Sequence, residues 1–138
     1  MKDHSTTITH VPPEQDAIRE KCFHPSGEFE EFPKEDLEKS IPDRFEKIVK
    51  RYPGRIAVRA GSQTVTYAEL NAMANRVARL IVNDRGSDAE AVGLFFEKGI
   101  PLMAAMLGVL KSGKFFILLD PSVPIDRMLA TLDNSEAH

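Results

Sequence analysis

One stretch of the sequence, residues 91–127, does most to limit what the chain can fold into. Two short runs within it, Ala91–Phe96 and Phe115–Leu119, are apolar at almost every position, which is typical of strands buried on both faces of a parallel sheet. Between them, Pro101 suits the first turn of a helix, and Gly113 suits the left-handed position just past its end. Because parallel neighbours need a crossover of this size, the stretch predicts a parallel β-α-β unit in an α/β fold.

The predicted crossover helix is apolar on nearly every side. Its apolar residues are Leu102, Met103, Ala104, Ala105, Met106, Leu107, Val109 and Leu110. A helix without a polar face must be covered on more than one side. We expect the rest of the chain to supply too little cover, so that the sheet is one part of a larger layered structure.

Composition narrows the functional classes. The chain has 138 residues, of which 42% are hydrophobic and 28% charged, as in an ordinary soluble domain. Its formal net charge of -3 gives no electrostatic reason to bind nucleic acid or an anionic membrane. The longest apolar run, Leu102–Leu110, is too short to cross a bilayer, and the first residues lack the apolar core of a signal peptide. One cysteine excludes an internal disulfide framework. We therefore expect a cytoplasmic protein.

Residues 1–39 are predicted to be an extended leader, because they are rich in polar residues and prolines and show little periodicity. Phe23, Phe29 and Phe32 are spaced as anchors to a folded body, and plain disorder is the open alternative. Ser40 then caps an amphipathic helix that ends at Pro53-Gly54. Its apolar stripe is Ile41, Phe45, Ile48, Val49 and Tyr52.

A β-hairpin and two further helices complete the predicted elements. Residues 55–66 alternate around Gly61-Ser62, which fits a two-residue hairpin turn with glycine first. The next helix starts with a capping box of Thr66 and Glu69 and is expected to stop by Gly86. Val65 and Leu70 occupy the positions of a hydrophobic staple around that start. The last helix opens at Pro124 and has a stripe of Ile125, Met128, Leu129 and Leu132.

Two segments carry a family resemblance. Residues 65–70, VTYAEL, resemble the first core motif of the adenylation domains of nonribosomal peptide synthetases, and residues 110–128, LKSGKFFILLDPSVPIDRM, resemble the second. Ser112 replaces the usual alanine, and residues 115–118 replace the usual aromatic-Val-Pro, with packing preserved. Their order and spacing are similar to those of adenylate-forming enzymes over residues 40–138.

The resemblance implies an incomplete subdomain of the adenylate-forming fold, truncated before the phosphate-binding loop. The parent would use ATP and Mg²⁺ to join an amino acid to AMP and pass it to the thiol of a phosphopantetheine carrier protein. In the family, the phosphate loop, the adenine-binding aromatic motif, the ribose-binding acid and the catalytic lysine all follow the second motif. We therefore expect no catalytic, cofactor-binding or metal-binding residue in residues 1–138, and an inactive fragment that binds no ATP.

Three alternatives stay open. The parent is an acyl-CoA or fatty-acyl-AMP synthetase, the chain is a complete small nucleotide- or flavin-binding module, or it is a non-catalytic piece that docks through an apolar helix face. A nucleotide-binding module needs a glycine-rich or hydroxyl-rich loop straight after a strand, and Glu97-Lys98-Gly99 is a poor substitute.

Candidate sites in the sequence have simpler structural interpretations. Gly108–Lys114 matches the spacing of a GxxxxGK phosphate loop, but here a helix leads into a strand, which favours a helix C-cap with two well-placed lysines. Cys22 and His24 lack a second pair of metal ligands, and His4, His10 and His138 lie in predicted flexible ends. Asp120 is interpreted as a strand-end turn residue, Asp126 as a first-turn acid, and Glu97-Lys98 as a solvated loop. The methionines Met73, Met103, Met106 and Met128 are predicted to fill the core.

Overall fold

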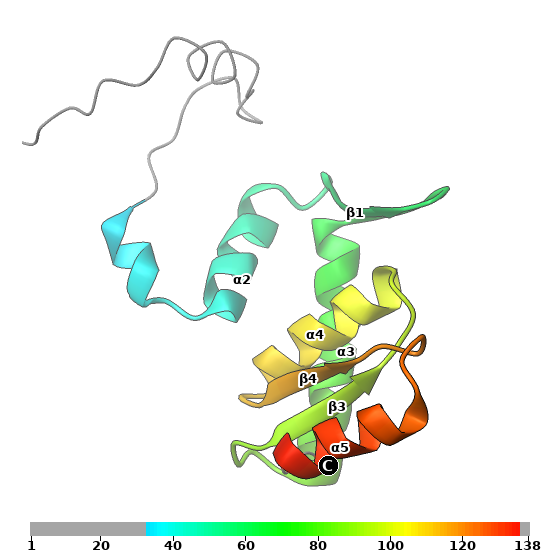
Figure 1. Cartoon of the computed structure of the whole chain (residues 1–138). Helices are drawn as coiled ribbons and strands as arrows, with labels where there is room; N and C mark the ends of the chain where they lie inside the picture. The colour runs from blue at the N-terminus through cyan, green and yellow to red at the C-terminus, as the bar shows by residue number, and fades with distance from the viewer. Residues whose placement is uncertain (1–32, 136–138) are drawn as a thin grey trace, which may run out of the picture. The chain divides into compact units, whose positions relative to one another are not determined.

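The computed structural model describes residues 33–135 of a chain that divides into two units, 1–37 and 38–138. The short 3-10 helix η1 (Lys34–Glu38) lies where extended chain is predicted. Phe23, Phe29 and Phe32 lie outside the described residues. The remaining elements (Figure 1) are α2 (Ile41–Arg51), β1 (Ile56–Ala60), β2 (Gln63–Thr66), α3 (Tyr67–Arg85), β3 (Ala91–Phe95), α4 (Ile100–Lys111), β4 (Phe115–Leu119) and α5 (Ile125–Ser135).

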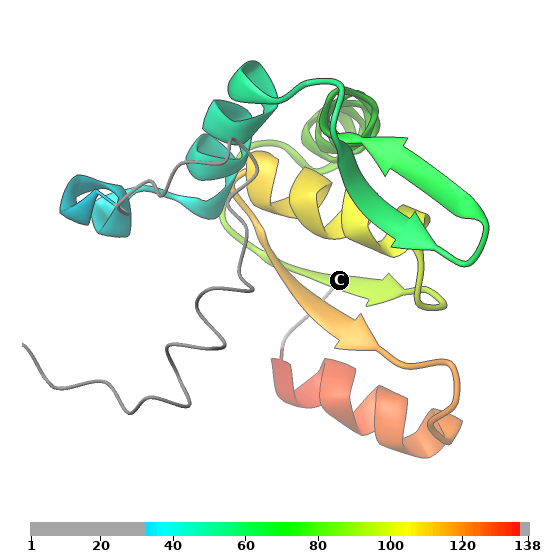
Figure 2. The same ribbon diagram turned by 90° about the horizontal axis from the view of Figure 1, so that it is seen from above.

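Strands β3 and β4 pair in parallel through the crossover helix α4, as predicted. Ala91 lies opposite Phe115, and Phe95 lies opposite Leu119. Helices α3 and α4 lie on one side of these strands and α5 lies on the other (Figure 2). A Cβ atom on Gly93 would be 3.2 Å from Cδ2 of Leu132, so the absence of a side chain lets α5 approach the sheet. The predicted α/β fold with a parallel unit is confirmed.

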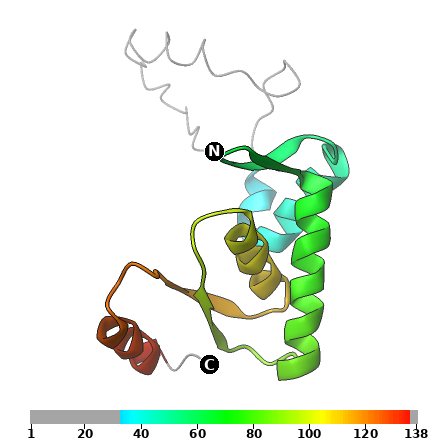
Figure 3. The same ribbon diagram turned by 90° about the vertical axis from the view of Figure 1, so that its right-hand side faces the viewer.

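The cover of α4 is more complete than the sequence suggests, which corrects our expectation. Helix α3 runs beside α4 (Figure 3), and Leu70 and Ala74 of α3 join Ala104 and Leu107 of α4 in one buried cluster. On its other side, α4 forms a second cluster with Leu94 of β3. The buried residues of α4 are Ile100, Ala104, Ala105, Leu107, Gly108 and Val109.

Cover is missing instead on the sheet and on α5. In residues 33–135 the two strands are not buried on both faces, since Phe95, Phe115 and Leu118 are each more than half exposed. Each strand also keeps one open edge there. On β3, β4 and α5, the large apolar side chains exposed by 51–64% are Phe95, Phe115, Leu118, Ile125 and Leu129. We call these five residues the open apolar set.

Helix α3 approaches α4 closely at a glycine. A Cβ atom built on Gly108 would lie 2.6 Å from both Cβ and Cγ1 of Val77 and 3.0 Å from the backbone oxygen of Ala74. Real Cβ contacts are essentially never shorter than 3.0 Å. Gly108 is therefore needed for the present separation of the two helices.

Helix α2 begins where predicted, and the hairpin of β1 and β2 turns where predicted. The N–H of Asp43 donates to Oγ of Ser40 over 3.2 Å, which caps α2. Gly61 has a φ of +59° in the turn between the antiparallel strands β1 and β2. Ile41 departs from the predicted stripe, since it is 64% exposed while the other four residues of that stripe are partly buried. It lies at the first position of α2.

Helix α3 begins with the predicted capping box. The N–H of Glu69 donates to Oγ1 of Thr66 over 3.3 Å, and the N–H of Thr66 donates to Oε2 of Glu69 over 2.8 Å. The carboxylate of Glu69 also accepts the hydroxyl of Thr66 over 2.9 Å, and the two hydrogen bonds that it accepts from Thr66 lower the pKa of Glu69. Val65 packs against the cluster that contains Leu70, as a hydrophobic staple requires. The helix ends where predicted, at Gly86, whose φ is +71°.

We expect Thr66→Ala to lower the free energy of unfolding by about 1 kcal/mol, because an orphan N–H of α3 loses its acceptor. Urea denaturation at one fixed protein concentration measures this change. Thr64→Ala is the matched control, since Thr64 is exposed in the same strand. Equal losses in the two variants would contradict the capping role of Thr66.

Candidate functional site

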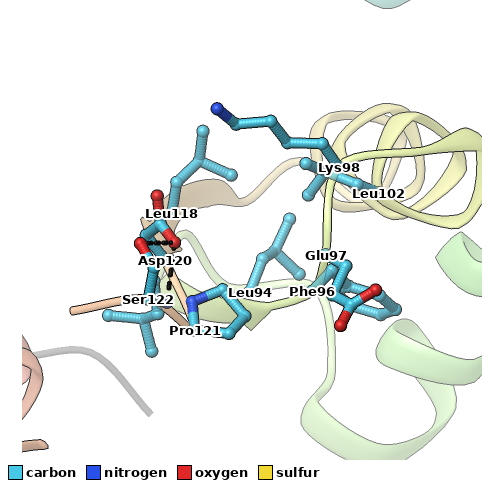
Figure 4. Close-up of a pocket in the computed structure, with 10 residues that line it drawn as sticks. Leu94, Phe96, Glu97, Lys98, Leu102, Leu118, Asp120, Pro121 and Ser122 are labelled. Carbon is cyan, nitrogen blue, oxygen red and sulfur yellow. Dashed lines mark hydrogen bonds between the residues drawn. The ribbon is translucent and has the colours of Figure 1, made fainter. Parts of the chain in front are cut away.

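A hollow of about 620 Å³ lies at the carboxyl ends of β3 and β4 (Figure 4). The carboxyl ends of parallel strands are the usual position for ligands in open α/β sheets. Its apolar lining is Leu94, Phe96, Leu102, Leu118, Leu119 and Pro121. Glu97 and Lys98 follow β3, and Asp120 and Ser122 follow β4, so the fold brings together two charged segments that are far apart in the sequence.

Asp120 is held in a tight turn by Ser122. One oxygen of its carboxylate accepts the N–H of Ser122 over 2.9 Å and the hydroxyl of Ser122 over 2.7 Å. These two hydrogen bonds, with the positive charge of Lys98 as a further cause, lower the pKa of Asp120. The predicted strand-end turn is confirmed. Asp126 lies in the first turn of α5, also as predicted.

The titratable side chains that line the hollow are those of Glu97, Lys98 and Asp120. Its lining contains no histidine and no cysteine, and the hydroxyl of Ser122 already donates to a carboxylate. A serine nucleophile needs a neighbouring general base that accepts its proton. Because its lowered pKa makes the Asp120 carboxylate a weak proton acceptor, we interpret Asp120 as a structural anion and not as a base for Ser122.

The segment Gly108–Lys114 is a helix C-cap, as predicted. Gly113 has a φ of +79°, and its N–H donates to the carbonyl of Leu110 over 3.2 Å. The N–H of Lys114 donates to the carbonyl of Val109 over 3.2 Å, which completes a Schellman motif. A phosphate loop needs these amides to be free and to face the positive end of a helix. The segment therefore does not fit the triphosphate of ATP.

Lys114 has a role that the sequence did not reveal. Its side chain is 0% exposed, and its ammonium lies 3.2 Å from Oε1 of Glu90 and donates to the carbonyl of Asp88 over 2.6 Å. Arg85, at the end of α3, donates to both carboxylate oxygens of Glu90 over 3.2 Å. We call Arg85, Asp88, Glu90 and Lys114 the Glu90 cluster. Lys111, the other lysine of the segment, pairs with Glu46 on α2.

The Glu90 cluster makes the stability of the folded chain depend on pH. Hydrogen bonds from Arg85, then from Lys114, lower the pKa of Glu90 from 4.5 to about 2. A carboxyl whose pKa is lowered on folding stabilises the folded state above its unfolded pKa and loses that effect as pH falls toward its folded pKa. As the pH is lowered from about 4.5 to about 2, we expect the urea concentration at the midpoint of unfolding to decrease. It should decrease less steeply in Glu90→Gln. Glu97→Gln, as the control, should keep the original slope.

Other sequence candidates are placed as follows. Met73 and Met106 pack against the two core clusters as predicted, whereas Met103 is 38% exposed at the start of α4. Cys22 and His24, like His4, His10 and His138, lie outside the described residues. Within residues 33–135, no three histidine, cysteine, aspartate or glutamate side chains gather as metal ligands. Over the same residues, every helix is too short or too polar to cross a membrane.

Residues 45–138 match the family model of the AMP-binding enzymes. The chain belongs to that family. Tyrocidine synthase 3 from Brevibacillus parabrevis is 36% identical over 100 residues, which are 72% of this chain and 2% of the relative. Surfactin synthase subunit 2 from Bacillus subtilis is 39% identical, over 72% of this chain and 3% of the relative. The chain thus spans a very small part of these curated relatives.

Solved structures of adenylation domains have the same arrangement. The N-terminal subdomain of Klebsiella oxytoca NpsA in complex with 3-hydroxyanthranilyl-AMSN has a TM-score of 0.68 at 25% identity, covering 72% of this chain and 25% of NpsA. An artificially fused adenylation-PCP di-domain, NpsA-ThdA, gives 0.69 at 25% identity, over 72% and 19%. A fatty acid AMP ligase from Legionella pneumophila gives 0.68 at 23% identity, over 78% and 20%, and so shares the fold. The recognition of the chain as the amino-terminal part of an adenylation domain is confirmed, and a nucleotide- or flavin-binding module of another family is excluded.

Proposed function

We propose that this chain is the amino-terminal portion of an amino-acid-activating enzyme of nonribosomal peptide synthesis. The parent would form an aminoacyl-AMP from ATP with Mg²⁺ and pass the aminoacyl group to the thiol of a phosphopantetheine carrier protein. The observation that carries this proposal is the 36–39% identity to peptide synthetases over 72% of the chain. The AMSN complex of NpsA and the fusion of NpsA to a PCP support the adenylate and the carrier partner.

Within that parent, residues 40–138 would act as a scaffold and residues 1–39 as a leader. ATP supplies the adenylyl group when bound to the parent. The segment Gly108–Lys114 offers no free phosphate cradle, because the amides of Gly113 and Lys114 donate to helix carbonyls and Lys114 is buried in the Glu90 cluster. We infer that residues 1–138 alone neither bind ATP nor catalyse adenylation.

An amino acid is favoured over a fatty acid as the activated substrate. A dimodular nonribosomal peptide synthase from Bacillus subtilis is 34% identical to this chain over 96 residues, whereas the fatty acid AMP ligase shares only the fold at 23% identity. We therefore do not advance the acyl-ligase alternative as a second function.

The deciding experiment compares the protein encoded by the whole reading frame that contains this chain with residues 1–138 alone. We expect the whole product to exchange pyrophosphate with ATP in the presence of particular amino acids, and residues 1–138 to show no exchange. Exchange that responds only to fatty acids would support the acyl ligase instead. Saturable ATP binding by residues 1–138 in calorimetry would contradict their scaffold role, and a reading frame without a downstream phosphate loop and lysine would favour an interaction module.

A further inference from the structure

The pairing of β3 with β4 raises the question of what fixes its register. In a strand with one buried face, the alternation of apolar and polar residues sets the register, because a slip of one residue exposes the apolar set. Residues 91–95 and 115–119 contain no polar residue, so the pattern of faces is a weak guide. A slip of two residues would even keep every side chain on its own face, and would place Phe95 opposite Ile117 instead of Leu119.

Polar partners sit at the amino ends of the same two strands. Lys114 and Glu90 each stand one residue before a strand, and their charged groups lie 3.2 Å apart with the lysine side chain fully buried. The N–H of Phe115 also donates to the carbonyl of Glu90 over 3.2 Å. A two-residue slip moves Lys114 by about 6.6 Å along β3. The slip would therefore leave the buried ammonium without its carboxylate.

We propose that the ion pair between the buried Lys114 and the partly exposed Glu90 sets the register of β4 against β3. In a slipped register the buried ammonium of Lys114 would lose its carboxylate, whereas Glu90 would keep Arg85. Specifying a register is the best-attested use of buried charged groups. The register also decides which residues meet in the hollow at the carboxyl ends of the strands. There Asp120 and Ser122 follow β4, and Glu97 and Lys98 follow β3. Lys114 therefore acts as a positioning residue for the hollow. This inference does not depend on the proposed function, because it concerns only strand pairing.

Disulfide trapping in the full chain tests the proposal. In a Cys22→Ser background, one reporter carries Phe95→Cys with Leu119→Cys, the native register, and a second carries Phe95→Cys with Ile117→Cys, the slipped register. Neighbouring strands are about 4.8 Å apart, within the Cα separation that a disulfide accepts. We expect the native pair to cross-link and the slipped pair to stay reduced, whereas Lys114→Met should raise the slipped product about tenfold.

Two further variants keep the test decisive. Glu90→Gln retains a hydrogen-bond acceptor for Lys114, so it should raise the slipped product by less, and it serves where Lys114→Met fails to fold. Lys111→Met removes the similarly buried lysine that pairs with Glu46 between helices, and it should leave the native cysteine pair dominant.

If Lys114→Met and Glu90→Gln only lower the melting temperature and still yield the native product alone, the ion pair of Lys114 and Glu90 is merely stabilising. If the Cys22→Ser background already yields both products, the pair does not fix the register. Either result overturns the proposal.

Discussion

Gly108→Ala is expected to destabilise the chain by about 1–3 kcal/mol, although alanine normally stabilises a helix interior by up to about 1 kcal/mol relative to glycine. The added methyl group would lie 2.6 Å from two carbon atoms of Val77 and 3.0 Å from the backbone oxygen of Ala74. Ala74 is 0% exposed, so α3 has little room to yield on that side. The helices must separate, and the cluster that Ala74 shares with Ala104 and Leu107 loosens with them.

Urea denaturation of Gly108→Ala and Gly54→Ala checks this prediction. A methyl group added at Gly54 would meet no atom within 4 Å, and Gly54 has no left-handed φ, so its substitution should stay within about 0.5 kcal/mol of the parent chain. A Gly108→Ala variant that is more stable than the parent would show that α3 and α4 are farther apart in solution.

The purified chain is also expected to self-associate. Each residue of the open apolar set leaves about half of its side chain in water, and apolar area forfeits about 25 cal/mol per Å² when it stays there. A few hundred Å² amounts to several kcal/mol, against about 5–15 kcal/mol for the whole stability of an ordinary domain. Because α4 is already covered, we expect association through the open apolar set and the free strand edges rather than through residues 102–110.

Light scattering over a range of protein concentrations, with dye binding and native-state hydrogen exchange, measures this association. Phe115→Lys should lower the average mass, whereas Leu80→Lys, the control at a residue outside the open apolar set that is 69% exposed on α3, should not. A monomer at every concentration, with strong amide protection across residues 91–119 and no dye binding, would contradict this prediction.

Signals that act over a few residues were readable from the sequence. The capping box needs only Thr66 and Glu69, three positions apart, and the end of α4 needs only Gly113 after an apolar helix. Both are confirmed, because their geometry follows from local backbone chemistry. Strands β3 and β4 were found for a similar reason, since a continuous apolar run bounded by turn residues has few other solutions.

Features that depend on distant partners were not readable. Lys114 looks like a solvated lysine at a helix end until folding brings Glu90 beside it. The cover of α4 required knowing that α3 crosses it at Gly108, and the hollow required both strand ends to meet. No periodicity or capping rule contains that information, because each feature joins segments that are separated in the chain.

The junction between the hairpin and α3 contains no loop at all. Thr66 is the last residue of β2 and also the N-cap of α3, and the N–H groups of Tyr67 and Ala68 donate to the carbonyls of Arg55 and Pro53 at the base of the hairpin. Helix α3 then runs for 19 residues, about 28 Å, to Arg85. Arg85 forms an ion pair with Glu90, the residue before β3. One helix, with no loop at its first end, thus connects the hairpin to the parallel sheet of β3 and β4. We therefore expect a displacement of the hairpin to move α3, and with it the amino end of β3.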